Sequence, residues 1–282
     1  MSHKVAIVTD STAYLPQDLI DHYRIRVTPL VLIWGKEIFK DGIDILPTEF
    51  YHRLQNAKII PTTSQPPVQN FKAIFTQLLN EDYDVLTILI SDKLSGTLDS
   101  AYQAAKGLPE DRIRILDSYT TSMAMGFQVI MAARAAEDGK DLNECLKVAE
   151  ETRDNTGVVF VVDTLEFLHR GGRIGGGARF LGTALKLKPI LEVVGGRVEA
   201  VERVRTKNKA NNRLLEIIEE RTRGKSPVRL AGLHANAMED AQVLLERAKK
   251  RTNAVETFFS KVSPVIGTHT GPGTIGLAYM TG

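Results

Sequence analysis

The chain has 282 residues, of which 43% are hydrophobic and 25% are charged, a composition typical of soluble globular proteins. Its formal net charge of +2 gives no support to a nucleic-acid-binding or membrane-surface protein, and no apolar run approaches the ~20 residues of a membrane span. The single cysteine, Cys145, excludes an internal disulfide, and the six histidines show no zinc-site spacing. No signal-peptide pattern opens the chain, so we expect a cytoplasmic protein without integral membrane association.

The first half alternates short apolar runs with segments of helical periodicity. Phe71, Ile74, Phe75 and Leu78, for example, fall on one face of a helix. In chain order we predict a strand at 5–8, a helix at 15–23, a strand at 27–33, a helix from 68, a strand at 85–90, a helix at 98–106, a strand at 113–116, and helices at 122–137 and 142–153. This alternation predicts a parallel sheet with helices on both faces.

The second half has a different organisation. We predict strands at 158–162, 189–194, 197–205, 228–233, 255–259 and 274–280, helices at 207–223 and 237–251, and a glycine-rich stretch at 171–182. Gly195 and Gly196 separate two of these strands, which predicts a hairpin and therefore antiparallel pairing. We expect a two-domain α/β protein, with a parallel α/β domain at 1–155 and a mixed α/β domain at 156–282.

Three polar clusters interrupt the apolar pattern of the first half. They are Thr-Asp-Ser-Thr at 9–12, Pro-Thr-Thr-Ser-Gln-Pro at 61–66, and Leu-Ser-Gly-Thr at 94–97. The first and third follow strands, and loops at the carboxyl ends of parallel strands converge on one crevice. The second precedes a helix, where free N–H groups attract anions. The clusters therefore predict an anion site, although each alone could be a helix cap without a ligand.

Two catalytic interpretations of these clusters are weaker. Asp10 could be a phosphotransferase nucleophile, but the residue two positions later is Thr12 rather than a second acid. Ser95 could be a hydrolase nucleophile, but it lacks the Gly-x-Ser-x-Gly motif, and no spacing pairs His269 with an orienting acid.

Two glycine-rich segments mark the second half. Residues 170–174 read Arg-Gly-Gly-Arg-Ile and precede three glycines, without the pattern of a nucleotide-binding loop. This segment could be a docking surface or a solvated turn. Residues 267–273 place His269 among hydroxyls and glycines, which makes that histidine a candidate for closing a site.

The motifs together resemble those of the DegV-like fatty-acid-binding proteins. The resemblance runs along nearly the whole chain, and it rests on residues 8–12, 29–30, 41–42, 61–66, 94–97, 117–118, 170–174, 188–189 and 267–273. Each motif alone is unspecific, whereas their order and spacing are highly specific. One departure is Pro67, where many relatives have serine.

The resemblance implies two α/β domains that hold a long-chain fatty acid, such as palmitate or oleate, between them. Some relatives are the lipid-carrying subunit of bacterial fatty acid kinases, whose ATP-binding partner subunit phosphorylates the carboxylate. The chain would then be no enzyme by itself and would need no metal or other cofactor. By motif match, the carboxylate would be held by Thr62 or Thr63, Ser95 and Gly96, with His269 nearby.

The same resemblance implies that exposed arginines face the kinase partner, namely Arg170, Arg173, Arg203 and Arg205. A site of hydroxyls and amides would need no arginine at the head group. Two alternatives stay open: a serine hydrolase of lipid esters that uses Ser95 and His269, and a regulatory protein that senses fatty acids.

Overall fold

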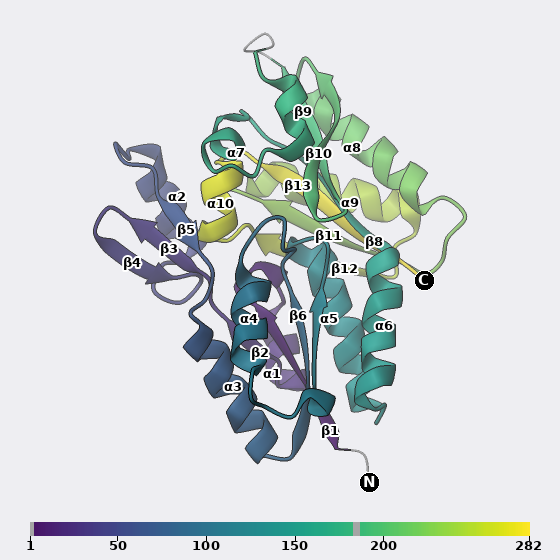
Figure 1. Ribbon diagram of the computed structural model, residues 1–282. Helices are drawn as coiled ribbons and strands as arrows, with labels where there is room; N and C mark the ends of the chain where they lie inside the picture. Colours follow the sequence, from purple (N-terminus) through teal and green to yellow (C-terminus); the bar gives the residue numbers. More distant parts are fainter. Residues whose placement is uncertain (1–2, 183–186) are drawn as a thin grey trace.

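The computed structural model describes residues 3–182 and 187–282 of an α/β protein with three sheets (Figure 1). The first sheet has four parallel strands in the order β2-β1-β6-β7, namely β1 (Lys4–Asp10), β2 (Arg26–Thr28), β6 (Tyr83–Leu89) and β7 (Ile113–Asp117). The parallel sheet predicted from the alternating pattern is therefore confirmed.

Helices cover both faces of this sheet. They are α1 (Gln17–Tyr23), α3 (Val68–Asn80), α4 (Thr97–Ala105), α5 (Ser122–Glu137) and α6 (Leu142–Asp154). Successive side chains of a strand point to opposite faces. Accordingly, Val8 packs into the core under α3 and α4, whereas Ile7 packs into the core under α5 and α6. A strand buried on both faces explains the unbroken apolar runs in the sequence.

The second sheet has six strands in the order β10-β9-β8-β13-β11-β12. They are β8 (Thr156–Val161), β9 (Lys188–Val194), β10 (Arg197–Val204), β11 (Val228–His234), β12 (Glu256–Lys261) and β13 (Ile275–Thr281). Only β11 and β12 pair in parallel, so the sheet is mixed, as predicted. The predicted β9–β10 hairpin turns at Gly195 and Gly196, which both have positive φ. Two helices, α8 (Lys207–Thr222) and α9 (Met238–Thr252), pack on one face.

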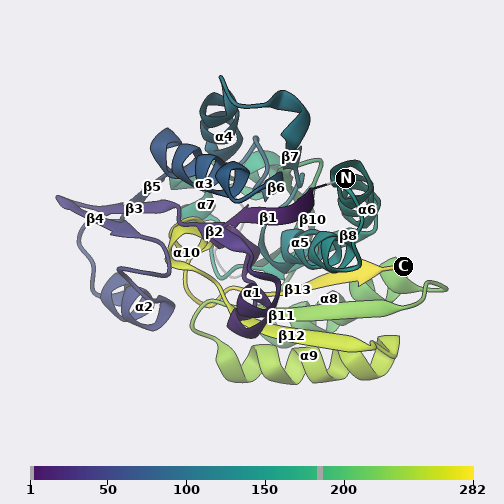
Figure 2. The ribbon, with the colours of Figure 1, turned by 90° about the horizontal axis from the view of Figure 1, so that it is seen from below.

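Helix α5 lies between the first and second sheets (Figure 2). One side packs in the core of the first sheet through residues such as Val129, while Phe127 and Ile130 share a core with Val158 and Ala278 of the second sheet. Of the 16 residues of α5, 12 are buried, as expected for a helix that is apolar on most sides. The chain enters the second sheet directly after residue 155. The division into domains 1–155 and 156–282 remains a prediction, since α5 contributes to both cores.

A small third sheet was not predicted. It consists of β3 (Val31–Trp34), β4 (Glu37–Lys40) and β5 (Thr62–Ser64) in the antiparallel order β4-β3-β5, with α2 (Pro47–Gln55) beside it. The prediction of a single strand at 27–33 is wrong, because two strands, β2 and β3, occupy this region. Pro29 and Leu30 separate them and lead the chain from the first sheet to the third. Proline has no N–H for a sheet ladder, which explains the break. Residues 62–64 of the polar cluster form strand β5, and the predicted helix follows from Val68, as expected.

Two short helices were also missed. They are α7 (Glu166–Arg170) and α10 (Pro264–Thr270), and three 3-10 segments lie at Ser11–Ala13, Glu110–Arg112 and Gly175–Phe180. Residues 267–270 of the segment 267–273 are therefore the end of the buried helix α10. Its glycine and threonines are poor helix formers, so sequence propensity gave no indication of it. No helix in the described ranges is long and apolar enough to cross a membrane.

Candidate functional site

A narrow cavity lies where the first sheet, the second sheet, the small sheet and α10 meet. The volume of this cavity is about 100 Å³. Most of its wall is apolar, with contributions from Leu30, Ile90, Leu94, Val158, Phe160 and Val193. Val158, Phe160 and Val193 belong to the second sheet, whereas Leu30 lies between β2 and β3, and Ile90 and Leu94 follow β6. These segments are distant in the sequence, so the cavity exists only in the fully folded chain.

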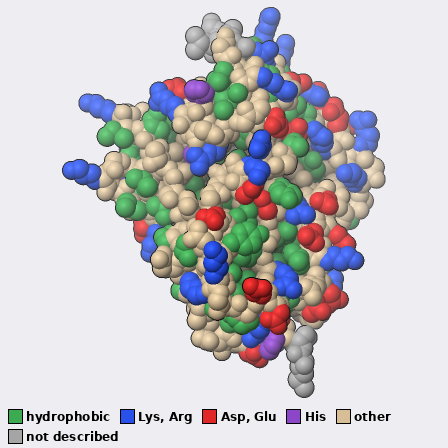
Figure 3. All heavy atoms as spheres, viewed as in Figure 1, with side chains coloured by type: hydrophobic (Ala, Val, Ile, Leu, Met, Phe, Trp, Pro, Cys, Tyr) green, Lys and Arg blue, Asp and Glu red, His purple; other side chains and the backbone are tan. Residues whose placement is uncertain are grey.

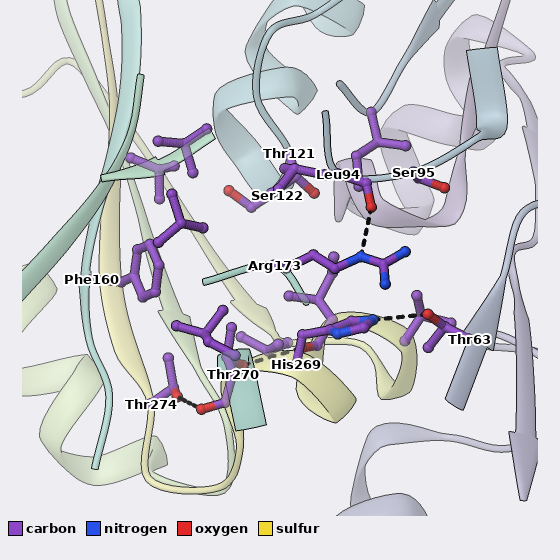
Figure 4. A pocket seen from close by; sticks show the side chains of 18 of the residues that line it. Thr63, Leu94, Ser95, Thr121, Ser122, Phe160, Arg173, His269, Thr270 and Thr274 are labelled. Atoms are coloured by element: carbon purple, nitrogen blue, oxygen red, sulfur yellow. Dashed lines mark hydrogen bonds between the residues drawn. The ribbon is translucent and has the colours of Figure 1, made fainter. Parts of the chain in front are cut away.

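One end of the cavity is polar. Thr63 of β5, Ser95 of the loop before α4, Arg173 after α7 and His269 of α10 all line it (Figure 4). The Oγ1 atom of Thr63 lies 2.8 Å from Nε2 of His269, which joins the small sheet to α10. The structure thus brings together three of the residues predicted to hold a carboxylate, Thr63, Ser95 and His269. Their role as ligand contacts stays a prediction.

Arg173 lies inside this site, which the sequence did not predict. Its Nε donates a hydrogen bond of 3.0 Å to the carbonyl of Leu94, and its Nη1 donates one of 2.6 Å to the carbonyl of Gly171. These two bonds engage Nε and Nη1 and fix the guanidinium at the polar end of the cavity. The side chain of Arg173 therefore lines the cavity and does not stand on an exposed docking surface as expected, whereas its docking role and the prediction that no arginine need contact the head group stay untested.

His269 is buried and neutral at physiological pH. Burial disfavours the imidazolium ion, and the nearby positive charge of Arg173 disfavours it further, so the pKa of His269 is lowered to about 4. The ring packs closely on Gly171, where a Cβ atom would clash with Nδ1. This close approach gives a physical reason for a glycine at position 171.

The lowered pKa predicts a pH-dependent cost to stability in the ligand-free protein. Unfolded His269 titrates near its ordinary value of 6.5, so between pH 6.5 and 4 the unfolded state binds more protons. The free energy of unfolding should therefore fall as the pH is lowered through this window, by about 3 kcal/mol from this one residue.

Chemical denaturation of wild type and His269→Gln at pH 7 and pH 4 measures this contribution. The comparison needs the variant because the pKa of buried Asp41 is raised to about 6, which favours the folded state as the pH falls. We expect the stability of wild type relative to the variant to drop between the two pH values. If the difference in unfolding free energy between wild type and the variant is the same at both pH values, the pKa of His269 is not lowered.

Two of the predicted carboxylate contacts lie outside the cavity wall. Thr62 is exposed, because neighbouring side chains of strand β5 point to opposite sides and Thr63 takes the inner one. Gly96 is also exposed and begins α4, and a Cβ atom there would lie 3.1 Å from the side chain of Gln65. Of the two threonines only Thr63 lines the cavity, and of Ser95 and Gly96 only Ser95 does; which of them contact a carboxylate stays a prediction.

The remaining predicted arginines are on the surface. Arg170 is exposed and pairs with Glu166 one helical turn earlier, at 2.5 Å. Arg203 is exposed on β10, with its guanidinium 4.8 Å from the centre of the Phe180 ring, and Arg205 is exposed just after that strand. On the face shown in Figure 3, basic and acidic side chains are interspersed. The exposure of these three arginines is compatible with docking, which stays a prediction.

The first polar cluster has a structural role instead of lining the cavity. Asp10 is fully buried, and its carboxylate accepts hydrogen bonds from the Thr12 N–H and hydroxyl and from the Ile90 N–H. Ser11 donates a bond of 2.7 Å to Asp41, whose other oxygen accepts from the Val265 N–H in the first turn of α10. The cap interpretation is therefore correct for this cluster, and the geometry gives no support to Asp10 as a nucleophile.

The geometry also gives no support to a serine hydrolase. The hydroxyl of Ser95 lies 2.8 Å from that of Thr97, while Nε2 of His269 is engaged by Thr63. Nδ1 of His269 has no hydrogen-bond partner among residues 3–182 and 187–282, so no acid orients the ring. Within the same ranges, no group of three or more His, Cys, Asp or Glu residues is placed to hold a metal.

Comparison with known proteins gives a consistent result. Residues 4–282 match a family model described as "Uncharacterised protein, DegV family". A DegV domain-containing protein from Streptomyces coelicolor is 38% identical over 279 residues, covering 98% of both chains. A fatty-acid-binding DegV family protein from Thermus thermophilus is 37% identical, with a TM-score of 0.93 over 99% of both chains. DegV from Bacillus subtilis, described as a fatty acid binding protein, is 33% identical, with a TM-score of 0.90 over both whole chains.

Proposed function

The chain belongs to the DegV family, and from this premise we propose that it binds one long-chain fatty acid in the cavity between its sheets. The observation that carries the proposal is a narrow apolar cavity with a polar end formed by Thr63, Ser95, Arg173 and His269. A fatty acid has the matching chemistry, since it joins one slim apolar chain to one carboxylate. We propose that this function needs no metal or other cofactor.

Burial of the tail supplies most of the binding energy. A saturated sixteen-carbon chain buries about fifteen carbons, which at ~0.8 kcal/mol each gives a gross gain of about 12 kcal/mol. Losses of ligand freedom and of association entropy offset part of this gain. An acyl chain of this length needs more volume than the narrow cavity has. We therefore expect the side chains that line the cavity to move apart when the ligand binds.

The polar end offsets the cost of burying a carboxylate. An isolated charge in an apolar site is unfavourable, whereas charge-assisted hydrogen bonds from Arg173 and from the hydroxyls of Thr63 and Ser95 compensate for it. A bound carboxylate would also favour protonation of His269, because a neighbouring negative charge stabilises the imidazolium ion. Head-group recognition therefore rests on one arginine, two hydroxyls and one titratable ring.

Native mass spectrometry of the purified protein tests the proposal directly. We expect an added mass equal to one fatty acid, which is released on denaturation and identified by lipid analysis. Protein that carries no lipid and also takes up neither added palmitate nor added oleate would overturn the proposal.

The neighbouring threonines of β5 provide a matched test of the head-group site. Thr63→Val removes one hydroxyl at nearly constant shape, and we expect palmitate affinity to fall about tenfold. Thr62→Val makes the same change on the exposed side of the strand and should leave affinity unchanged. Titration calorimetry with lipid-free protein measures both. Equal affinities for the two variants would remove Thr63 from the site.

We further propose that the loaded protein presents its fatty acid to an ATP-binding kinase subunit in the cytoplasm, which forms the acyl phosphate. Two features support this: the carboxylate end holds polar groups that suit an acyl phosphate as well, and Arg170, Arg203 and Arg205 are exposed for contact. Palmitate-loaded protein mixed with ATP and such a subunit should yield the acyl phosphate, trapped as a hydroxamate. Fatty acid binding without any transfer would instead favour a regulatory protein that senses lipid.

A further inference from the structure

Two hydroxyl groups that line the cavity have no hydrogen-bond partner among residues 3–182 and 187–282. Thr121 is 7% exposed and Ser122 is 4% exposed, and both residues border the cavity (Figure 4). Neither Oγ1 of Thr121 nor Oγ of Ser122 has a partner within the described part of the chain. A buried hydroxyl that makes no hydrogen bond is costly, so these two groups call for an acceptor or donor from outside the protein.

Other hydroxyls of the same cavity are already satisfied. Thr270 donates to the carbonyl of Ile266, and Thr274 donates to the carbonyls of Thr270 and Gly271. Thr270 and Thr274 therefore have backbone partners, and Thr63 contacts the ring of His269. The unpartnered pair is a distinct feature, and it lies across the cavity from His269 and Thr270 in the view of Figure 4.

The pair stands at the N-terminus of α5, a helix of 16 residues. The first N–H groups of a helix have no partner within it, and Thr121 at the capping position forms no side-chain bond to them. Ser122 has a positive φ of 60°, an uncommon conformation for a residue other than glycine, and such conformations cluster at ligand-binding sites. Hydroxyls and helix N–H groups together make a place that attracts an oxygen acceptor.

We propose that the natural ligand class is a fatty acid with an oxygen atom on its chain, as a hydroxyl or keto group that is received by Thr121 and Ser122. This inference rests on the proposed fatty acid binding and adds a second point of recognition to it. The carboxylate remains at the end formed by Arg173 and His269. Each of these hydroxyls can donate one hydrogen bond and accept others, so a hydroxyl or keto oxygen suits the pair better than a plain methylene.

Paired ligands and paired variants test the proposal. Lipid-free protein is titrated with stearate and with stearates that carry one hydroxyl at carbon 3, 10, 12 or 18. In wild type, we expect at least one hydroxystearate to bind more tightly than stearate. In Thr121→Val, which removes only the hydroxyl at nearly constant shape, we expect this preference to shrink about tenfold. Ser122→Ala is a second variant with the same expected direction.

Thr270→Val is the matched control, because its hydroxyl lines the same cavity but already has a backbone partner. It should leave the ratio of the two affinities unchanged. If stearate binds but no hydroxystearate is preferred, or if Thr121→Val and Ser122→Ala keep the wild-type ratio at every position, the inference is overturned while fatty acid binding stands. If neither ligand class binds, the proposed function itself fails.

Discussion

Arg173→Ala is expected to weaken palmitate binding about 10- to 100-fold. The guanidinium lines the polar end of the cavity and is held in place by bonds to the carbonyls of Leu94 and Gly171. A hydrogen bond to a charged group contributes about 1.5–3 kcal/mol, which corresponds to this range of affinity. The loss should fall on the carboxylate, so binding of the neutral alcohol of the same chain length should change little.

Arg170→Ala is the matched control for this variant. Arg170 belongs to the same short segment but is exposed and paired with Glu166. Displacement of a fluorescent fatty acid from lipid-free protein compares wild type with both variants, for palmitate and for hexadecanol. If Arg173→Ala binds palmitate as tightly as wild type does, Arg173 does not contact the carboxylate. The role expected from the sequence alone, that of a docking residue, would then be favoured.

Val193→Asp is expected to abolish palmitate binding, with a loss of at least about a hundredfold. Val193 lines the apolar wall of the cavity from strand β9. An aspartate there would have to lose its water when an acyl chain enters, and burial of an unpaired charge costs several kcal/mol. The same substitution also removes apolar surface that the chain would contact.

The next residue of the strand supplies the control. Val194 is 53% exposed, because successive side chains of a strand point to opposite faces. Val194→Asp introduces the same charge one position along and should leave palmitate affinity near that of wild type. Circular dichroism and thermal unfolding of the lipid-free variants verify that both are folded. Palmitate binding by a folded Val193→Asp would mean that the tail lies elsewhere.

The sequence predicted the two large sheets because their strands carry strong local patterns. Buried strands such as β6 are largely apolar runs, and α5 is apolar over most of its length, so pattern and structure agree. The small sheet lacks such a pattern. Strand β5 has only three residues, all polar, and its pairing with β3 is set by contacts distant in the chain. Local propensity contains no information of that kind.

The candidate site was predictable only in part, for a related reason. Thr63, Ser95 and His269 stand in motifs that a sequence comparison can recognise. Arg173 follows two glycines in a segment without helical or strand periodicity. The sequence therefore did not show that its side chain points into the cavity. Thr121 and Ser122 resemble ordinary residues at a helix start, and only the structure shows that their hydroxyls are unpartnered beside the cavity.

The position of α5 between two sheets has a consequence for synthesis of the chain. One side of the helix packs on the first sheet, but the partners of Phe127 and Ile130 in the second sheet include Val158 and Ala278, which are made later. At 5–20 residues per second, the ribosome needs roughly 6 to 25 s to add the 127 residues from 156 to 282. During that interval the nascent first half exposes an apolar helix face, the kind of surface to which chaperones bind.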